Sequence, residues 1–261
     1  MSAPAIRFDG KRVLVTGGAS GIGETVARLL SDLGARVVIA DLNREQLDPA
    51  AQRTAAADVT QGDVASEDDA ERMVREAITA LGGLDLVFNS AGIGDDLVPV
   101  HDQSVERWQR VIDVNLKGTY LMCRAASRPM LRQRCGAIVN VSSIVGLGGF
   151  PRRSAYAAAK AGINHLTHTL ACEWGPSGIR VNAIAPAYTR TPMVQALLER
   201  KAFDPTILER RTPLGRLALP EEMARAAMFL LSDWASYITG TVLPVDGGWS
   251  AFGGAGDVAS A

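Results

Sequence analysis

A glycine-rich turn between a short strand and a helix constrains the fold more than any other feature of this chain. The turn spans residues 16–23 (TGGASGIG), the apolar run Arg12–Thr16 precedes it, and apolar residues recur at helical spacing over 22–33. Glycine permits positive φ and close approach to the backbone, and a following helix directs its first amides toward an anion. This arrangement is typical of the site where a parallel α/β sheet binds the pyrophosphate of a dinucleotide.

The rest of the chain alternates short apolar runs with amphipathic segments, which predicts a parallel sheet. Further strands are expected at 36–40, 84–89, 137–142, 180–185 and 241–245, and helices at 68–81, 103–132, Ser154–Trp174 and 222–231. Right-handed crossovers turn such a series into an α/β, Rossmann-like doubly wound sheet with helices on both faces. Since no linker interrupts it, residues 1–261 are expected to form a single domain with a Gly- and Ala-rich tail over 247–261.

Charge and composition disfavour a polyanionic partner. The chain has 27 Lys and Arg against 28 Asp and Glu, a formal net charge of -1, and no clustered basic run. Cys123, Cys135 and Cys172 are scattered, as is typical of reduced thiols in a cytosolic protein. Neither a signal-peptide core nor a run of roughly 20 apolar residues is evident. We therefore expect a cytoplasmic protein that binds neither nucleic acid nor membrane.

Asp41 is the residue that favours NAD over NADP. It ends the second expected strand at about the 20-residue distance typical of a ribose-binding acid. Its carboxylate can accept both ribose hydroxyls of NAD and repels the 2′-phosphate of NADP. Ser20 and Leu42, where a cation would hold that phosphate, carry no charge, although Arg44 is close in sequence. The alternative role for Asp41 is an N-cap of the following helix.

Tyr156 and Lys160 are the strongest candidates for chemistry. They lie four residues apart in an expected helix, so both side chains project from one face. A lysine ammonium about 4 Å from the phenol is worth roughly 4 kcal/mol at an effective dielectric near 20, which lowers the pKa of the tyrosine toward neutral. Ser143 follows the strand 137–142 at the carboxyl edge of the sheet, where open α/β folds bind ligands. A Tyr-x-x-x-Lys pair by itself is more often a solvated helix face.

Taken in order and at these intervals, the motifs resemble the short-chain dehydrogenase/reductase family over nearly the whole chain. The matching segments are the turn at 16–23, Asp63-Val64, Asn89-Ser90-Ala91-Gly92 where the family has N-N-A-G, Asn115, Ser143, Tyr156, Lys160 and the D-G-G at 246–248.

The resemblance implies a role for each catalytic residue. Tyr156 would be the acid/base and Ser143 the group that orients the substrate oxygen. Lys160 would bind the nicotinamide ribose and lower the pKa of Tyr156, and Asn115 would hold a water that links Lys160 to solvent. Motifs and resemblance together imply these cofactor-binding residues: Gly17, Ser20, Gly21, Ile22, Gly23, Asp41, Leu42, Asp63, Val64, Asn89, Ala91, Gly92, Tyr156, Lys160, Pro186, Thr189 and Thr191.

The sequence departs from the family pattern at Ala187, where a glycine usually follows Pro186 and lets the backbone approach the nicotinamide. Substrate contacts are expected from Ser143, Tyr156 and Arg153, and a cation at Arg153 favours a hydroxylated or anionic substrate unless it is simply a solvated arginine at a helix start. The residues 94–96 either bind hydroxyl groups or form an ordinary Asp-rich turn. These features favour a polyol, sugar or small hydroxy compound over a bulky steroid.

We therefore predict an NAD-dependent oxidoreductase that interconverts a secondary alcohol and its ketone. Two alternatives stay open: an NADPH-dependent 3-oxoacyl-thioester reductase of the same family, and a catalytically silent NAD-binding protein. His165 and His168 share a helix face without a third ligand spaced with them, so no metal is expected. Apolar residues on more than one face of Ser154–Trp174, with the amphipathic segment 222–231, predict a homo-oligomer, in this family most often a tetramer.

Overall fold

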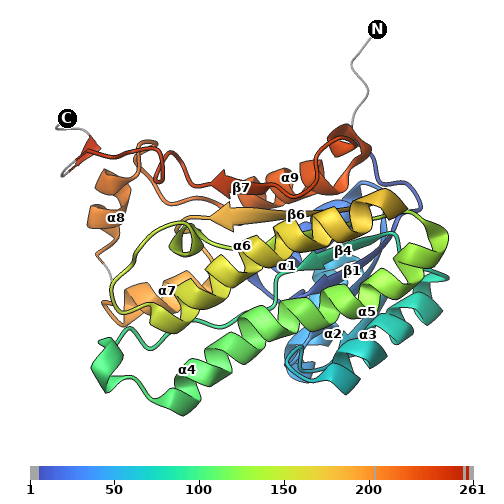
Figure 1. Ribbon diagram of the computed structural model, residues 1–261, viewed down its shortest axis with the longest axis horizontal. Helices are drawn as coiled ribbons and strands as arrows, with labels where there is room; N and C mark the ends of the chain where they lie inside the picture. The colour runs from blue at the N-terminus through green and yellow to red at the C-terminus, as the bar shows by residue number, and fades with distance from the viewer. Residues whose placement is uncertain (1–5, 203, 255–256, 259–261) are drawn as a thin grey trace, which may run out of the picture.

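Seven parallel strands form one sheet in the computed structural model, which describes residues 6–202, 204–254 and 257–258. The order across the sheet is β3-β2-β1-β4-β5-β6-β7, and Figure 1 shows β1, β4, β6 and β7 in that order. The strands are β1 (Arg12–Thr16), β2 (Arg36–Asp41), β3 (Asp58–Gln61), β4 (Leu86–Asn89), β5 (Gly136–Val141), β6 (Ile179–Pro186) and β7 (Val242–Val245). The chain leaves β1 in one direction along the sheet to β2 and β3, and returns to place β4 on the other side of β1, which opens a crevice at the carboxyl edge.

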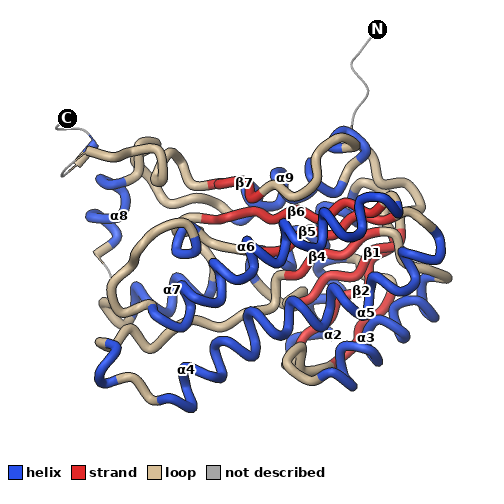
Figure 2. Tube along the Cα trace, viewed as in Figure 1, coloured by secondary structure: helices blue, strands red, loops and turns tan. Residues whose placement is uncertain are grey.

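Helices cover both faces of this sheet (Figure 2). One face packs against α1 (Gly21–Asp32), α2 (Arg44–Thr54) and α9 (Pro220–Leu231), and the other against α3 (Glu67–Leu81), α5 (Gly118–Gln133) and α6 (Ser154–Trp174). Each layer has its own apolar core, centred on side chains such as Leu30 and Phe88 on the first face and Met73 and Met122 on the second. The predicted doubly wound, single-domain α/β fold is confirmed.

Two elements on the β3 side were not expected from the sequence. The strand β3 is only four residues long and half of them are exposed, so it lacks an apolar run. The helix α2 contains Pro49 and buries only three side chains, so its apolar periodicity is weak. Short edge strands and solvated helices give little hydrophobic pattern, which explains both omissions.

The expected helix 103–132 is interrupted. It consists of α4 (Val105–Ile112), a π-helical turn at Asp113–Lys117 and α5. The side chain of Asn115 supplies the reason, because its Nδ2 donates to the carbonyl of Val111 (2.9 Å) and so competes with the backbone for that acceptor. A π-turn of this kind often marks a functional position.

Beyond the carboxyl end of β6, the chain forms α7 (Pro192–Glu199) and α8 (Pro205–Arg211), which lie apart from the sheet (Figure 1). The described part of the C-terminal tail is fastened to α8, since the Arg211 guanidinium donates to the carbonyls of Trp249 and Phe252. Residues 255–256 and 259–261 of that tail lie outside the described part of the chain. Across the described residues, no helix combines the length and the apolar character required to cross a bilayer.

Candidate active site

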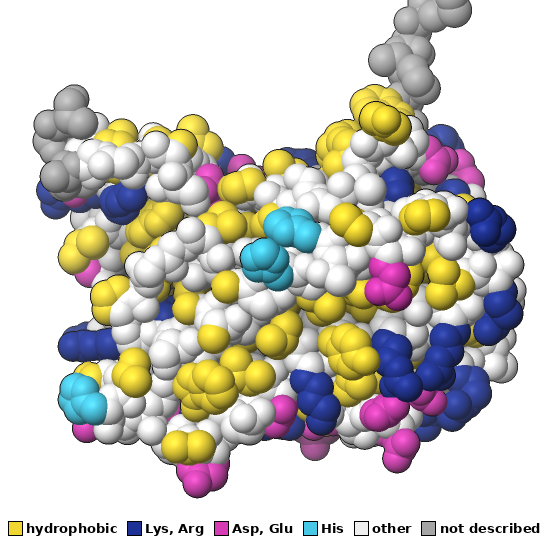
Figure 3. Space-filling view, viewed as in Figure 1, with side chains coloured by type: hydrophobic (Ala, Val, Ile, Leu, Met, Phe, Trp, Pro, Cys, Tyr) yellow, Lys and Arg dark blue, Asp and Glu magenta, His cyan; other side chains and the backbone are white. Residues whose placement is uncertain are grey.

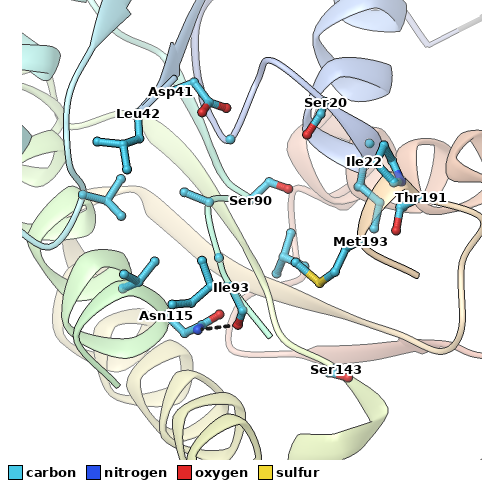
Figure 4. Close-up of a pocket in the computed structure, with 18 of the residues that line it drawn as sticks. Ser20, Ile22, Asp41, Leu42, Ser90, Ile93, Asn115, Ser143, Thr191 and Met193 are labelled. Atoms are coloured by element: carbon cyan, nitrogen blue, oxygen red, sulfur yellow. Dashed lines mark hydrogen bonds between the residues drawn. The ribbon is translucent and has the colours of Figure 1, made fainter. Parts of the chain in front are cut away.

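A cleft of about 420 Å³ opens at the carboxyl edge of the sheet, next to the β1–β4 switch point. Figure 4 shows Asp41 and Leu42 at one end of this cleft and Ser143 at the other. The predicted site residues that line it are Gly17, Ser20, Gly21, Ile22, Asp41, Leu42, Asp63, Val64, Ala91, Gly92, Asn115, Ser143, Tyr156, Lys160, Pro186, Thr189 and Thr191.

Three predicted residues, all within the described chain, lie outside that lining. Gly23 is buried in the turn, Asn89 hydrogen-bonds Asn140 in the core (2.9 Å), and the guanidinium of Arg153 lies over the ring of Tyr156. Several lining residues were missed by the sequence analysis, among them Ser90, Ile93, Arg110 and Met193. Ser90 lies within the motif at 89–92 and Ile93 follows it directly, so their position in the sequence could have indicated a place in the cleft. Arg110 and Met193 belong to no motif.

The glycine turn is shaped to let another group approach its backbone. Gly17 and Gly21 adopt positive φ (64° and 57°), and a Cβ on Gly23 would lie 2.1 Å from the carbonyl oxygen of Gly17. Thr16 fixes the turn against the segment after β4, since its Oγ1 accepts from the amides of Ser90 (3.2 Å) and Ala91 (3.3 Å). Because α1 begins at Gly21, its N-terminus faces the same space, and the cradle fits a dinucleotide pyrophosphate.

The carboxylate of Asp41 is held at the end of β2 by two backbone amides. Oδ2 accepts from Ala19 (3.2 Å) and Oδ1 from Asn43 (3.2 Å), so the group stays beside the glycine turn. The N-cap of α2 is Asn43, whose side chain accepts from the amide of Glu45, so the alternative capping role does not fall to Asp41. Arg44 forms an ion pair with Asp48 at 3.5 Å.

Asp63 lies on the wall next to this carboxylate and is paired with a cation. Its Oδ2 accepts from Arg110 (3.0 Å) and its Oδ1 from the amide of Ala65 (2.9 Å). Val64 is buried against Gly118, where a Cβ would come within 2.8 Å of the Val64 side chain. The acid–aliphatic pair is therefore rigidly placed at the end of β3.

Ser143, Tyr156 and Lys160 meet at the other end of the cleft. The Nζ of Lys160 donates to the carbonyl of Val141 (2.7 Å) and lies 5.2 Å from the centre of the Tyr156 ring. Ser143 Oγ accepts from the amide of Val145 (3.2 Å). The elements that position these groups are the end of β5 and the first two turns of α6, so the predicted juxtaposition is present.

The electrostatics of this trio differ from the sequence expectation. Burial raises the pKa of Tyr156, and the charge of Arg153 and the polar hydroxyl of Ser143 partly oppose that rise. Burial lowers the pKa of Lys160 to about 7, so the lysine is not a fully charged neighbour at neutral pH. In the protein alone, desolvation of the phenol therefore outweighs the stabilisation expected from Lys160.

Asn115 leaves one acceptor unused close to Lys160. Its Nδ2 donates to the carbonyls of Ile93 (2.9 Å; Figure 4) and Val111, whereas Oδ1 is buried without a hydrogen-bond partner among the described residues. A Cβ built on Gly92 would lie 2.6 Å from this Oδ1 and 3.9 Å from the Nζ of Lys160. A buried, unpaired acceptor next to an amine fits a water molecule there.

Ala187 lies where the strand β6 leaves the sheet. Its amide donates to the carbonyl of Val245 (3.3 Å), and its carbonyl accepts from the Oγ1 of the buried Thr189 (3.1 Å). The residue lines the cleft between Pro186 and Thr189. The methyl group is therefore accommodated in a segment that is tied to β7.

Arg153 is not a solvated arginine. Its side chain is 11% exposed, its guanidinium carbon lies 4.7 Å from the centre of the Tyr156 ring, and its Nε is 3.6 Å from the Oδ2 of Asp95. Asp95 is buried and accepts from the amide of Tyr156 (3.1 and 3.3 Å), so it holds the first turn of α6. Asp96 instead pairs with Arg107 at 3.0 Å and is half exposed.

The two histidines of α6 lie side by side on the surface, with ring centres 5.6 Å apart (Figure 3). Over the described ranges, no group of three or more His, Cys, Asp or Glu side chains is placed to hold a metal ion.

Comparison with known proteins places the chain among its relatives. A family model described as "Enoyl-(Acyl carrier protein) reductase" matches residues 17–250. The chain belongs to the short-chain dehydrogenase/reductase family. The predicted family and the assignment as an oxidoreductase are thereby confirmed.

Two curated proteins and one solved structure show which activities are named among similar proteins. A cis-4-hydroxycyclohexanecarboxylate dehydrogenase of Sinomonas cyclohexanicum is 44% identical over 94% of this chain and 98% of its own length. The 3-oxoacyl-(acyl-carrier-protein) reductase FabG of Thermotoga maritima is 40% identical over 93% of this chain and 99% of its own. The crystal structure of levodione reductase superposes with a TM-score of 0.89 at 36% identity, covering 94% and 99% of the two chains.

Proposed function

We propose that this protein is an NAD-dependent dehydrogenase that interconverts a secondary alcohol on a small carbon ring and the corresponding ketone. The observation that carries the proposal is a single cleft with Asp41 at one end and Ser143, Tyr156 and Lys160 at the other. The first group suits an unphosphorylated ribose, and the second suits proton transfer at a carbinol oxygen. We propose Asn115, Ser143, Tyr156 and Lys160 as the catalytic residues.

The surroundings of Asp41 support NAD. Leu42 and Asn43 follow it in the cleft lining and carry no charge, and Arg44 is paired with Asp48. A 2′-phosphate would meet the Asp41 carboxylate, and two like charges about 4 Å apart cost several kcal/mol at an effective dielectric near 20. The same repulsion disfavours the thioester-reductase alternative, which uses NADPH.

The side chains of the protein carry out the proton transfer in this reaction. Once bound, the nicotinamide cofactor accepts or returns the hydride of the substrate carbon. Ser143 Oγ orients the substrate oxygen, and the Tyr156 hydroxyl takes its proton during oxidation and gives it back during reduction. Lys160 and a water molecule held at the Oδ1 of Asn115 then transfer that proton to solvent. Because oxidation requires the ionised phenol and burial raises the pKa of Tyr156, the oxidation rate is expected to rise with pH.

The substrate class is proposed from the relatives and from the apolar surroundings of the site. The relative from Sinomonas is named for a ring-borne secondary alcohol. Three aromatic rings form one group beside Ala187. The ring centres of Tyr188 and Trp249 lie 5.4 Å apart, and those of Phe150 and Trp249 lie 6.5 Å apart. Tyr188 follows the cleft-lining Ala187, so this aromatic group adjoins the substrate end, where it suits an apolar ring.

The experiment is a comparison of cofactors and substrates. The purified protein is incubated with NAD or NADP and a panel of ring alcohols, including cis-4-hydroxycyclohexanecarboxylate and cyclohexanol, with a polyol and a sugar alcohol as further members. Reduced cofactor is followed by its ultraviolet absorbance. We expect turnover of ring alcohols with NAD at least tenfold above NADP. Turnover confined to NADPH and an acetoacetyl thioester would instead establish the reductase alternative.

We further propose that the protein works as a cytoplasmic homo-oligomer, most simply a tetramer. The outer face of α6 supports this, because Ala158 and Ala161 are exposed on it beside the two surface histidines. Light scattering of the wild type and of Ala161→Glu is the test, with a smaller species expected for the variant. A monomeric wild type would refute the proposal.

A further inference from the structure

Arg153 is a buried cation beside the reacting group of the site. Its residue exposure is 9%, whereas the neighbouring Arg152 is exposed. Arginine is rarely buried unless its charge is paired and its donors are hydrogen-bonded. The guanidinium carbon lies 4.7 Å from the centre of the Tyr156 ring, so the cation faces the aromatic system that carries the catalytic hydroxyl.

The guanidinium of Arg153 donates no hydrogen bond to another described residue. Its Nε is buried without a hydrogen-bond partner. The nearest carboxylate, Asp95, is 3.6 Å from Nε, beyond hydrogen-bond distance. Both oxygens of Asp95 instead accept from the amide of Tyr156. A guanidinium has five donors in a planar fork, and here the fork lacks its acceptor.

Among the described residues, the charge of Arg153 is paired only with Asp95. This ion pair is 3.6 Å long, so it compensates charge without providing a hydrogen bond. Burial raises the pKa of both Tyr156 and Tyr188, and the charge of Arg153 opposes that rise, so the cation lies within electrostatic reach of both phenols. An anionic group of the substrate would supply the hydrogen-bond acceptor that the guanidinium lacks.

We propose that Arg153 is the carboxylate-binding residue of the substrate site, and that the preferred substrate is a hydroxy acid whose alcohol is oxidised while its carboxylate is held by the guanidinium. The planar fork matches the two oxygens of a carboxylate and can bind them bidentately. This inference rests on the proposed function, because it assigns the second polar group of the ring alcohol that Tyr156 and Ser143 act on.

The first test compares a charged and an uncharged alcohol. Wild type, Arg153→Met and Arg153→Lys are assayed with NAD on cis-4-hydroxycyclohexanecarboxylate and on cyclohexanol. The variant Arg153→Met is expected to lose about 30-fold more kcat/KM on the acid than on cyclohexanol, which corresponds to roughly 2 kcal/mol. Arg153→Lys should retain part of the preference because it keeps the charge and loses the fork. Cyclohexanol also reports any effect of Arg153 exerted through the pKa of Tyr156.

Matched variants separate binding from folding. Arg152→Met removes the same charge from the adjacent, exposed position and should leave the ratio of the two substrates unchanged. Because Arg153→Met leaves Asp95 without its nearby cation, the double variant Arg153→Met with Asp95→Asn restores charge neutrality. It should fold as the wild type does, by circular dichroism, and still lack the preference for the acid.

A binding measurement keeps the inference testable without turnover. Cyclohexanecarboxylate, which has no hydroxyl to oxidise, is titrated into the protein with reduced cofactor and followed by calorimetry. We expect saturable binding by the wild type and an affinity at least tenfold weaker in Arg153→Met. Equal losses on both alcohols, or equal carboxylate binding by both proteins, would overturn the inference and leave the proposed function intact. Absence of turnover on every alcohol would overturn the proposed function alone, since the calorimetric result decides the carboxylate site independently.

Discussion

The two ends of the cleft are built in different ways. The nucleotide end is made of backbone: the β1–α1 turn, the ends of β2 and β4, and glycines whose missing Cβ atoms leave space. The substrate end is made of side chains: Ser143 after β5, Tyr156 and Lys160 on α6, and Met193 and Val194 on α7. Strand pairing fixes the first end, whereas individual side-chain contacts fix the second.

This difference separates what each end can change. A side chain at Gly17 or Gly23 meets backbone atoms and must alter the fold to be accommodated. A substitution beside Arg153 or Tyr188 alters charge and shape locally while the sheet stays as it is. The nucleotide end is therefore expected to keep its backbone shape across related proteins, and the substrate end to set which alcohol is oxidised.

The largest effect is expected from removing the phenol oxygen of Tyr156, the proposed acid/base. Tyr156→Phe should lower kcat by at least about a thousandfold, because general acid–base catalysis contributes on the order of 10²–10⁴ and no other described side chain is placed to replace it. Fluorescence titration should give an unchanged affinity for NADH. Tyr120→Phe, at an exposed tyrosine of α5, is the control. Near-normal turnover by Tyr156→Phe would refute the assignment of the acid/base.

The second effect concerns the cofactor and should be confined to the nucleotide end. Asp41→Asn removes the charge that repels a 2′-phosphate, so the ratio of kcat/KM for NAD to that for NADP should fall by about a hundredfold, or roughly 3 kcal/mol. Steady-state kinetics with both cofactors measures it, and Asp58→Asn at the exposed start of β3 provides the matched control. An unchanged ratio would count against Asp41 as the discriminating residue.

A pair of glycine substitutions tests the contrast between backbone and side chains directly. Gly23→Ala places a Cβ 2.1 Å from the carbonyl of Gly17, whereas a Cβ on Gly94 meets no described atom within 4 Å. We expect Gly23→Ala to lose about 3 kcal/mol of unfolding free energy, and Gly94→Ala to change by less than about 0.5 kcal/mol. Urea denaturation compares the two, and equal stabilities would contradict the account of the turn.

The smallest effect is expected at Ala187, on the boundary between the two ends. Its methyl lies in a segment already fastened to Val245 and Thr189, so Ala187→Gly should change kcat by about twofold or less and slightly lower the melting temperature. Stopped-flow kinetics and thermal unfolding measure the two quantities. A tenfold gain in kcat would show that the methyl obstructs the cofactor.

The same contrast explains how much the sequence predicts. The sheet, its helical layers and the nucleotide end were predicted because glycine turns, apolar strands and Asp41 leave periodic or spaced signals. The strand β3 and the helix α2 were missed because they bury little apolar surface. The π-turn at Asn115 was missed because a side-chain hydrogen bond causes it, and periodicity does not register such a bond.

At the substrate end, the sequence indicated individual residues but not the contacts and burial of their side chains. Arg153 was named as a candidate, yet its burial, its distance from Asp95 and its place over Tyr156 depend on contacts between segments far apart in the chain. The direction of the pKa shift of Tyr156 was wrong for the protein alone, because the desolvation that raises it is a property of packing and not of the Tyr-x-x-x-Lys spacing. Met193 and Arg110 line the cleft without belonging to any motif.

The central claim is that one cleft joins a nicotinamide site to a group that removes the proton of an alcohol. Its most direct test follows the hydrogen on carbon. Cyclohexanol that carries deuterium at the carbinol carbon is incubated with the protein and NAD, and the reduced cofactor is weighed by mass spectrometry. The expected result is a cofactor heavier by one deuterium, with cyclohexanone as the product. Release of the deuterium into water, or ketone formed without reduced cofactor, would contradict the account.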